Sequence, residues 1–352
     1  MVSELTGLDA RARDVLASVV VAYIRSAAPV SSRQLTREGA FALSPASLRN
    51  AMADLEDLGF LTHPHVSAGR VPTDLGYRLF VQDLMTAQAP TLAEKERIAS
   101  DLDPEPVELD RFLHATSRVL SRLTGQVGVV AAPDSRRFVL DSVHFARVAE
   151  RKILVVQVSR TGLVDSRLIE TRQDYSSAEL EAIGRRLTVD FGGRALDEIR
   201  RLLLEALEHE KVLFDATLQR ALELGRRAFA GGRDDGPEVF VEGTEQLLGK
   251  PEFRRDVEAL KRLFKAFEEK ARLVSFLSDC LAGKGTTVVI GSESPLTGES
   301  GGAVVATSYG EPGQPLGVLA VMGPRRMEYS RIVPLVEELG RYVSRRLAEE
   351  KP

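Results

Sequence analysis

Residues 31–77 constrain the fold of this chain more than any other stretch, because they read in succession as a short helix, a longer helix and a hairpin. Ser31 has the side chain of a helix N-cap, and Gly39 marks where the short helix can stop. Ser44 can cap the longer helix, and Pro45 fits its first position, where the missing N–H would be unpaired in any case. This order of elements is that of a winged helix-turn-helix.

The longer helix has two chemically different faces. Its opening turns carry Ser47, Arg49 and Asn50, residue types that hydrogen-bond phosphates and base edges in a major groove. Such a polar face is by itself more often only solvated, so the prediction depends on the elements around the helix. The apolar face, which we expect to pack inward, consists of Leu48, Met52, Leu55 and Leu58.

A short hairpin follows the longer helix, which we expect Gly59 to end. Strands are predicted at residues 60–63 and 70–71, with a polar turn at 66–69, and Pro72 stops the second strand. Together with the two capped helices, this hairpin favours DNA binding. The side chains predicted to face duplex DNA, near bases or phosphates, are Ser31, Ser32, Arg33, Ser44, Ser47, Arg49, Asn50, His65, Ser67 and Arg70.

Bulk charge does not indicate a nucleic-acid-binding protein, because the net charge is −4 and the pI is about 5.9. The distribution of charge does. Between residues 25 and 50 four arginines stand against Glu38 alone, which gives this stretch a net charge of +3. The acids Asp54, Glu56 and Asp57 fall at the far end of the longer helix. We therefore expect a small cationic surface at its start.

Length and composition allow two or three domains, because the chain has 352 residues of which 43% are hydrophobic. The longest apolar run, residues 15–24, is too short to span a bilayer, and the N-terminus lacks the pattern of a signal peptide. The single cysteine, Cys280, excludes an intramolecular disulfide and is expected to be a buried thiol in a helix. These features predict a cytoplasmic protein.

Apolar patterns predict the remaining elements. Helices are expected over residues 9–26, 73–87, 92–97, 107–123 and 177–191 and near the C-terminus, and strands over 127–131, 138–143, 153–158, 162–170, 286–290, 303–308 and 316–321. Two strand clusters separated by helices can belong to one sheet with an inserted subdomain.

The stretch between the two strand clusters reads as mainly helical. Residues 195–229 form a long helical pattern, and 239–242 can add one strand. A heptad-like seam follows at Phe253, Val257, Leu260, Phe264, Phe267, Ala271 and Val274. Such a seam needs a partner, which can be the 195–229 helix or a second subunit, and the spacing does not choose between them.

No catalytic constellation is present. The sequence contains no nucleophile elbow, P-loop, zinc-protease motif or paired-cysteine motif, so we expect neither an enzyme nor a cofactor. His63 and His65 lie on one strand face, but two histidines without an additional carboxylate or thiolate ligand nearby in the sequence are a weak basis for a metal site. Contact with phosphate, or simple exposure, explains them better.

Two polar, glycine-containing segments are the other candidate sites. Residues 291–302 follow a predicted strand and carry Glu293, and residues 323–329 place Arg325 and Arg326 at the start of a helix, where an anion can bind. Both segments can edge a ligand pocket. Ordinary turn and capping roles also account for them, because strand ends require such turns.

Four segments can be compared with known families: PVSSRQL at 29–35, SPASLRNAMADLEDLGFL at 44–61, HPHVSAGRVPTDLGYRLFV at 63–81 and GPRRMEYSRIVPLV at 323–336. They resemble HrcA, the bacterial family of heat-inducible transcription repressors, and the resemblance runs nearly from one end of the chain to the other. Ala51 stands where that family commonly has a glutamate, which leaves the details of base reading open but not the mode of docking.

The resemblance implies an α+β multidomain protein. Its parts would be a winged helix-turn-helix domain at 1–88, a linker at 89–105, a GAF-like α/β sheet domain in two parts at 106–194 and 283–352, and a mainly helical inserted dimerisation domain at 195–282. The resemblance also implies a homodimer on an inverted-repeat operator of chaperone genes, a chaperonin as modulator, and release on heat stress. The alternative is a winged-helix regulator whose GAF-like domain senses a small metabolite.

Overall fold

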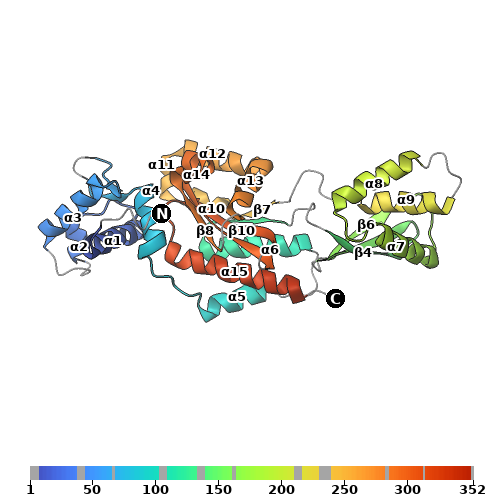
Figure 1. The fold of residues 1–352 in the computed structure, drawn as a ribbon. Helices are drawn as coiled ribbons and strands as arrows, with labels where there is room; N and C mark the ends of the chain where they lie inside the picture. The colour runs from blue at the N-terminus through green and yellow to red at the C-terminus, as the bar shows by residue number, and fades with distance from the viewer. Residues whose placement is uncertain are drawn as a thin grey trace.

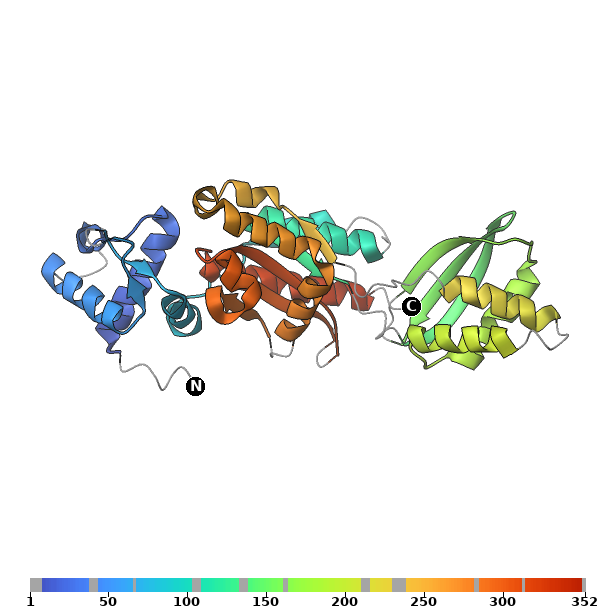
Figure 2. The same ribbon diagram turned by 90° about the horizontal axis from the view of Figure 1, so that it is seen from above.

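Three bodies follow one another along an elongated molecule (Figures 1 and 2). The structure, a computed structural model, describes residues 8–37, 44–65, 68–102, 109–132, 139–160, 164–209, 216–229, 239–281, 285–311 and 314–349. We call the three bodies the head (residues 8–84), the central domain (residues 92–132 and 239–349) and the distal domain (residues 139–229). The head and the distal domain lie at opposite ends.

The head contains the predicted helices and hairpin in the predicted order. Its elements are α1 (Ala10–Ser26), α2 (Ser32–Arg37), α3 (Pro45–Asp57), β1 (Leu61–Thr62), β2 (Val71–Pro72), α4 (Asp74–Leu79) and the π-helical turn η1 (Phe80–Leu84). Leu61 pairs with Pro72, so this proline lies within the second strand rather than after it. The helix predicted over 73–87 ends earlier, with η1.

The apolar face of α3 packs inward on α1, as predicted, over most of its length. Leu48, Met52 and Leu55 are buried, whereas Leu58 is 56% exposed. The prediction was wrong at Leu58, because an advance of about 100° per residue places its side chain about 80° away from that of Leu48, at the edge of the buried face.

The central domain is built on one antiparallel sheet of five strands in the order β7-β3-β10-β9-β8. The strands are β3 (Val127–Ala131), β7 (Val239–Glu242), β8 (Thr287–Ile290), β9 (Gly302–Glu311) and β10 (Gln314–Pro324). Two apolar clusters lie on its two faces, because successive side chains of a strand point to opposite sides. Val130 and Leu319 belong to one cluster, and their neighbours Val129 and Ala320 belong to the other.

Helices cover both faces of this sheet. The first cluster includes residues of α6 (Leu109–Thr124) and α15 (Tyr329–Glu349). The second includes residues of α10 (Glu245–Leu248), α11 (Pro251–Arg255), α12 (Val257–Glu268), α13 (Lys270–Leu281) and α14 (Pro295–Ser300). The short helix η4 (Gly291–Glu293) joins β8 to α14.

The apolar seam predicted between residues 253 and 274 is not one helix. Asp256 (φ −126°, ψ 85°) and Glu269 (φ −79°, ψ 67°) leave helical geometry and divide the stretch into α11, α12 and α13. Leu263 and Leu273 lie outside the predicted seam yet are 1% and 0% exposed, whereas Val257 within it is 54% exposed. These helices pack on α14, β9 and β10, a partner that neither prediction named.

The segment predicted as a linker at 89–105 contains a docked helix, α5 (Leu92–Leu102). Ile98 and Leu102 are 1% and 3% exposed within the main apolar core. Glu94 accepts a hydrogen bond from Arg331 of α15 at 2.8 Å. Only residues 85–91 therefore connect the head to the central domain, without a helix or strand of their own.

The distal domain corrects the predicted domain boundaries. It consists of β4 (Leu140–Ala149), β5 (Lys152–Ser159), β6 (Val164–Glu170), α7 (Ser177–Phe191), α8 (Leu196–His209) and α9 (Ala216–Phe229). Its three strands form a separate sheet in the order β4-β5-β6 rather than joining β3. The body inserted into the central domain thus spans 139–229, not 195–282, because pairing between distant strands decides membership of a sheet.

Candidate nucleic-acid interface

Ser44 fixes the first turn of α3. Its Oγ accepts a hydrogen bond from the backbone N–H of Ser47 at 3.1 Å, and the two hydroxyl oxygens lie 3.0 Å apart. Leu48 anchors the same turn in the head core with 0% exposure. Because each helical residue is rotated by about 100° from the last, Arg49 and Asn50 turn outward, and both are exposed.

The short helix α2 packs against α3 and presents Arg33 on its exposed side. Ser31 Oγ accepts a hydrogen bond from the backbone N–H of Gln34 at 3.2 Å, so Ser31 caps α2 as predicted. Ser32, also predicted to face DNA, is only 6% exposed. The first turn of α2 directs its side chain inward, which corrects the expectation of a surface contact there.

Glu56, in the last turn of α3, holds the hairpin in place. Its Oε2 lies 2.6 Å from Arg70 Nη2, and its Oε1 hydrogen-bonds to His63 Nδ1. Arg70 and Val30 also exchange two backbone hydrogen bonds of 2.8 Å each. Arg70 was predicted to face DNA, but its guanidinium has this partner inside the head, so its observed role is to position the hairpin.

The hairpin lies close to the segment between α1 and α2. A Cβ atom added to Gly69 would come within 2.4 Å of the Val30 carbonyl oxygen, so only glycine fits this approach. Of the two predicted contacts at the hairpin tip, His65 is exposed, and Ser67 lies outside the described residues.

The outward surface of the head carries positive charge. Within the described ranges, Arg33 and Arg49 have no acidic partner, in contrast to Arg70. The exposed acids Asp54 and Asp57 lie towards the far end of α3, as the sequence predicted. Exposed guanidinium groups at the start of a helix, beside an amide such as Asn50, suit phosphate oxygens and base edges.

The helices α2 and α3 lie at the tip of the molecule, facing away from the central domain (Figure 1). An α-helix fits the width of the major groove of B-form DNA. The described parts of the central and distal domains lie on the opposite side of the head from α2 and α3 (Figure 1).

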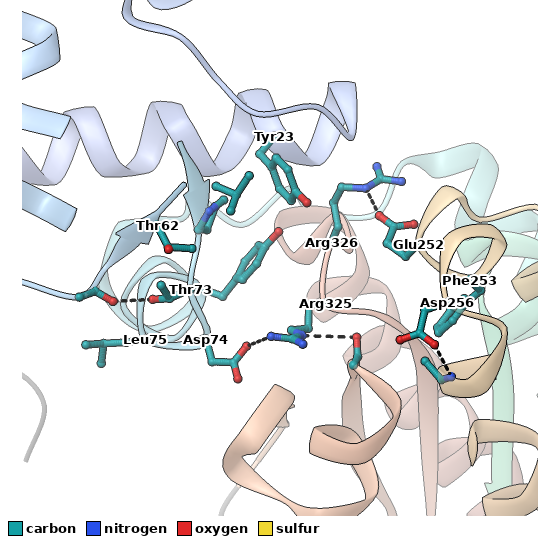
Figure 3. A pocket seen from close by; sticks show the side chains of 16 residues that line it. Tyr23, Thr62, Thr73, Asp74, Leu75, Glu252, Phe253, Asp256, Arg325 and Arg326 are labelled. Atoms are coloured by element: carbon teal, nitrogen blue, oxygen red, sulfur yellow. Dashed lines mark hydrogen bonds and ion pairs between the residues drawn. The ribbon is translucent and has the colours of Figure 1, made fainter. Parts of the chain in front are cut away.

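The two polar segments that were predicted to edge a ligand pocket border a pocket of about 640 Å³ between the head and the central domain (Figure 3). The two arginines of the second segment, residues 323–329, however, face carboxylates of the same chain. Arg325 Nη1 lies 2.7 Å from Asp74 Oδ1, and Arg326 Nε lies 2.5 Å from Glu252 Oε1. Sequence reasoning missed these contacts, because complementary charges so far apart in the chain carry no local signal.

Two further candidate groups offer no separate chemistry. In the part of the chain that the structure describes, no cluster of three or more histidine, cysteine, aspartate or glutamate side chains is suited to hold a metal ion. Cys280 is buried, as predicted, and burial raises the pKa of its thiol to about 11, which keeps it protonated at neutral pH.

None of the described helices has the length and apolar character needed to cross a membrane.

Comparison with known proteins gives consistent results. Residues 110–333 match the family model described as the HrcA protein C terminal domain. The chain is 38% identical over 346 residues to the heat-inducible transcription repressor HrcA of Geobacter sulfurreducens, covering 98% of this chain and 100% of the relative. It is 37% identical over 330 residues to that of Xanthomonas campestris pv. campestris, covering 94% and 93% of the two chains.

One solved structure has a similar fold. It is described as that of a hypothetical protein at 2.2 Å resolution, and it matches with a TM-score of 0.71 and 24% sequence identity over 97% of this chain and 99% of the other. At that identity the likeness concerns the fold alone.

Proposed function

This chain belongs to the HrcA family of heat-inducible transcription repressors, and from that premise we propose that the outward surface of its head reads an operator in duplex DNA. The family is one of DNA-binding repressors, not of enzymes. We define the outward surface by its exposed or half-buried polar side chains, which are Ser31, Arg33, Ser47, Arg49, Asn50 and His65.

Within this surface, α3 would lie in the major groove with Ser47, Arg49 and Asn50 nearest the bases. Arg33 and the groups around it would hold phosphates and fix the register of the head on the duplex. Ser44 would act indirectly as the cap of α3, and Arg70 by holding the hairpin. The observation that carries the proposal is the exposure of Arg49 and Asn50 on a capped, core-anchored turn.

A gel-shift titration tests this assignment. We expect the full chain to bind an inverted-repeat operator more tightly than a scrambled duplex. Arg49→Ala and Asn50→Ala should each weaken operator binding by about 1–3 kcal/mol, because each removes one base contact. Arg185→Ala, which removes another exposed arginine from α7, serves as the control and should have no effect. Equal affinity for both duplexes, or unchanged binding by the two variants, would refute the assignment.

We further propose that two copies of the chain associate through the distal domain. Ile153 and Val155 of β5 face the helices and are 2% and 0% exposed. The alternate residues Leu154, Val156 and Val158 must therefore lie on the other face of the sheet. Strand pairing sets Leu154 beside Leu168 and Val158 beside Val164.

This second face is mostly apolar and open within the described chain, although strand pairing sets the polar residues His144 and Ser166 beside Val156. Leu168 and Val164 are 53% and 39% exposed, and in Figure 2 the three helices of the distal domain lie on one side of its sheet. An apolar sheet face of this kind is suited to bury itself against its own copy, since a two-fold dimer brings identical surfaces together. The central position of Val156 marks it as the middle of the contact.

Sedimentation tests the dimer contact. Val156→Glu should shift the full chain towards the monomer, because a carboxylate would be buried against apolar residues. Val189→Glu is the matched control, since Val189 lies on the helical side of the same domain and is 81% exposed. A variant that remains as dimeric as the control would show that the contact lies elsewhere.

The same premise supports three finer proposals. The operator is an inverted repeat upstream of chaperone genes, a chaperonin modulates the repressor, and heat relieves repression by dissociating the dimer. Loss of the second half-site contact lowers overall affinity sharply, because linked sites bind with an avidity that single sites lack. Sedimentation across a temperature ramp should show monomers when DNA is released, and intact dimers at that point would contradict the last proposal.

A second candidate function is a small-metabolite sensor. The pocket between the head and the central domain is lined by Tyr77 and Glu252, and the Tyr77 hydroxyl and Glu252 Oε2 are buried without a hydrogen-bond partner in the described residues. A ligand with hydrogen-bond donors would satisfy both atoms. A metabolite that raises the melting temperature and also changes operator affinity would favour this function over regulation by a chaperonin.

A further inference from the structure

The first helix after the hairpin, α4, is bound to the central domain through Asp74. One carboxylate oxygen lies 2.7 Å from Arg325 Nη1, and the other accepts a hydrogen bond of 2.9 Å from the backbone N–H of Ser292. Gly291 adjoins this contact with φ +50°, and a Cβ atom there would lie 2.2 Å from Asp74 Oδ2. The loop and the carboxylate thus fit each other so closely that no side chain can intervene.

One turn later, Arg78 binds the same region. Its guanidinium forms an ion pair with Glu293, and its Nη2 donates to the Val288 carbonyl oxygen at 2.6 Å. Glu293 is itself held by the backbone N–H of Ile290 at 2.8 Å. The Arg78 and Glu293 side chains are 18% and 31% exposed, so solvent screens this pair less than a surface pair.

A third link joins the other side of the head. Arg326 Nη1 donates to the Ile24 carbonyl oxygen at the end of α1, and its Nε donates to Glu252 of α11, both at 2.5 Å. Between these polar contacts the buried rings of Tyr77 and Tyr329 pack with centroids 6.1 Å apart. The head is therefore bound at α1 and at α4.

The covalent connection cannot set the orientation of the head by itself. Residues 85–91 contain no helix or strand, and the middle of this stretch is joined to α15 by a backbone hydrogen bond of 2.8 Å from Gln88 N–H to the Ser330 carbonyl oxygen. A flexible connection lets a tethered domain sample many orientations. The non-covalent contacts must therefore fix the head.

Charge supports the same conclusion. Burial alone would raise the pKa of Asp74, but the Ser292 N–H and the Arg325 guanidinium together lower it below its ordinary value. The carboxylate is thus ionised and engaged at neutral pH. Tyr329, beneath this cluster, is fully buried, and burial raises the pKa of its hydroxyl.

We infer that Asp74, Arg78, Glu293, Arg325 and Arg326 form a latch that positions the head for DNA recognition without touching DNA. Held by the latch, the two heads of a dimer would present their α3 helices at one separation and one angle. This inference rests on the proposed dimeric operator reader. With a rigid head, the second half-site is bound at high effective concentration only when the half-sites are spaced to match it.

The test compares the full chain with the Arg78→Gln, Arg325→Gln double variant. A control double variant, Arg185→Gln with Arg341→Gln, removes two exposed arginines that pair within their own helices. Each protein is titrated with a single half-site, with the inverted-repeat operator, and with repeats whose spacer is lengthened by about five base pairs, about half a helical turn.

We expect the half-site affinity to be the same in all three proteins, because the outward surface is unchanged. The wild type and the control should prefer the native spacing by about 100-fold or more, and the latch variant by less than about 10-fold. Glu293→Gln, a smaller change, should give an intermediate preference if the double variant does not fold. A folded latch variant with the wild-type spacing preference would overturn the inference.

A measurement without DNA separates the latch from the proposed function. Spin labels at Arg11→Cys on α1 and Glu96→Cys on α5 report the distance between head and central domain, and both positions are exposed. The distance distribution should be narrow in the wild type and broad in the latch variant. Equal widths would overturn the latch, whereas a narrow distribution in a wild type that ignores spacing would refute the two-site operator reading instead.

Discussion

The two sides of the head differ in how their charges are satisfied. On the outward side, Arg33 and Arg49 are exposed and have no acidic partner among the residues that the structure describes. On the inward side, Asp74 and Arg78 each bind a charged group and a backbone group of the central domain. A charge left unpaired by its own chain is available to an external partner, whereas a paired charge fixes the position of one element on another.

This contrast explains how a chain with a net charge of −4 can bind a polyanion. Charges paired within the fold largely cancel at a distance, so bulk charge says little about a local surface. What matters is the charge that remains unpaired where the duplex would lie. The predictions below separate the two sides of the head by effects on DNA binding and on stability.

The largest effect is expected from charge reversal on the outward side. Arg49→Glu should lower operator affinity by about 100-fold or more, because it removes a base contact and adds repulsion from phosphates. Its free energy of unfolding should change by less than about 0.5 kcal/mol, since Arg49 is exposed. Gel-shift titration and urea denaturation measure the two quantities. A loss of stability as large as the loss of binding free energy would contradict the assignment of Arg49 to DNA contact alone.

On the inward side, Gly291→Ala should act on stability instead. The added Cβ atom would meet the Asp74 carboxylate, at a φ of +50°. We expect a loss of about 1–3 kcal/mol in the free energy of unfolding. Gly285→Ala is the matched control, because it also has positive φ, +85°, but nothing within 4 Å of its Cβ position. Equal losses in the two variants would show that the head contact contributes nothing.

The salt dependence of binding sharpens the assignment of phosphate contacts. Arg33→Ala should reduce the slope of log K against log salt concentration by about 1, as expected for one lost phosphate contact. Arg326→Ala, on the inward side, should leave the slope for a single half-site unchanged. Titrations at several salt concentrations give both slopes. A slope reduced by Arg326→Ala but not by Arg33→Ala would place the phosphate contacts on the inward side instead.

Tyr77→Phe should have a small effect. The Tyr77 side chain is 2% exposed, and its hydroxyl has no hydrogen-bond partner among the described residues, so removing that oxygen should leave the free energy of unfolding unchanged or raise it by up to about 1 kcal/mol. Urea denaturation of the full chain measures the change. A clear loss of stability would mean that a water molecule or a ligand satisfies the hydroxyl, which would favour the metabolite sensor.

The smallest effect is expected from pH. Because the pKa of Asp74 is lowered in the folded protein, the unfolded chain binds the proton more readily, and stability rises with pH across that window. The contribution is complete above about pH 4 and is lost as the pH falls through the lowered value. The urea midpoints of wild type and Asp74→Asn should therefore converge in acid and differ by a constant amount above about pH 4. A difference that changes with pH near pH 7 would contradict the assignment.

Local chemistry made the head predictable. Ser31 and Ser44 cap their helices as expected, and Pro45 opens α3, because these signals act within one helical turn. The exposure of Arg49 and Asn50 also follows from helical periodicity once Leu48 is placed inward. The sequence did not reveal that Ser32 points inward or that Glu56 holds Arg70, since both depend on how neighbouring elements pack.

Domain membership could not be read in the same way. The strands from 140 to 170 have the same apolar texture as β3, yet they form their own sheet, and β7 crosses over to join β3. Helix signals were correct for α7 but not for the seam, which Asp256 and Glu269 interrupt. Strand pairing and helix docking depend on contacts between segments far apart in the chain. Apolar periodicity shows only that one face of an element is apolar, not what that face packs against.

By itself, then, the sequence determined the helices and caps of the head, the exposure of Arg49 and Asn50 and the absence of a catalytic motif. The tertiary structure alone decided which strands form which sheet and that Arg325 and Arg326 bind carboxylates of their own chain. The physical reason is range. Helix caps and apolar periodicity depend on residues a few positions apart, so they can be recognised in the sequence. An ion pair between residues 74 and 325 exists only after the chain has folded.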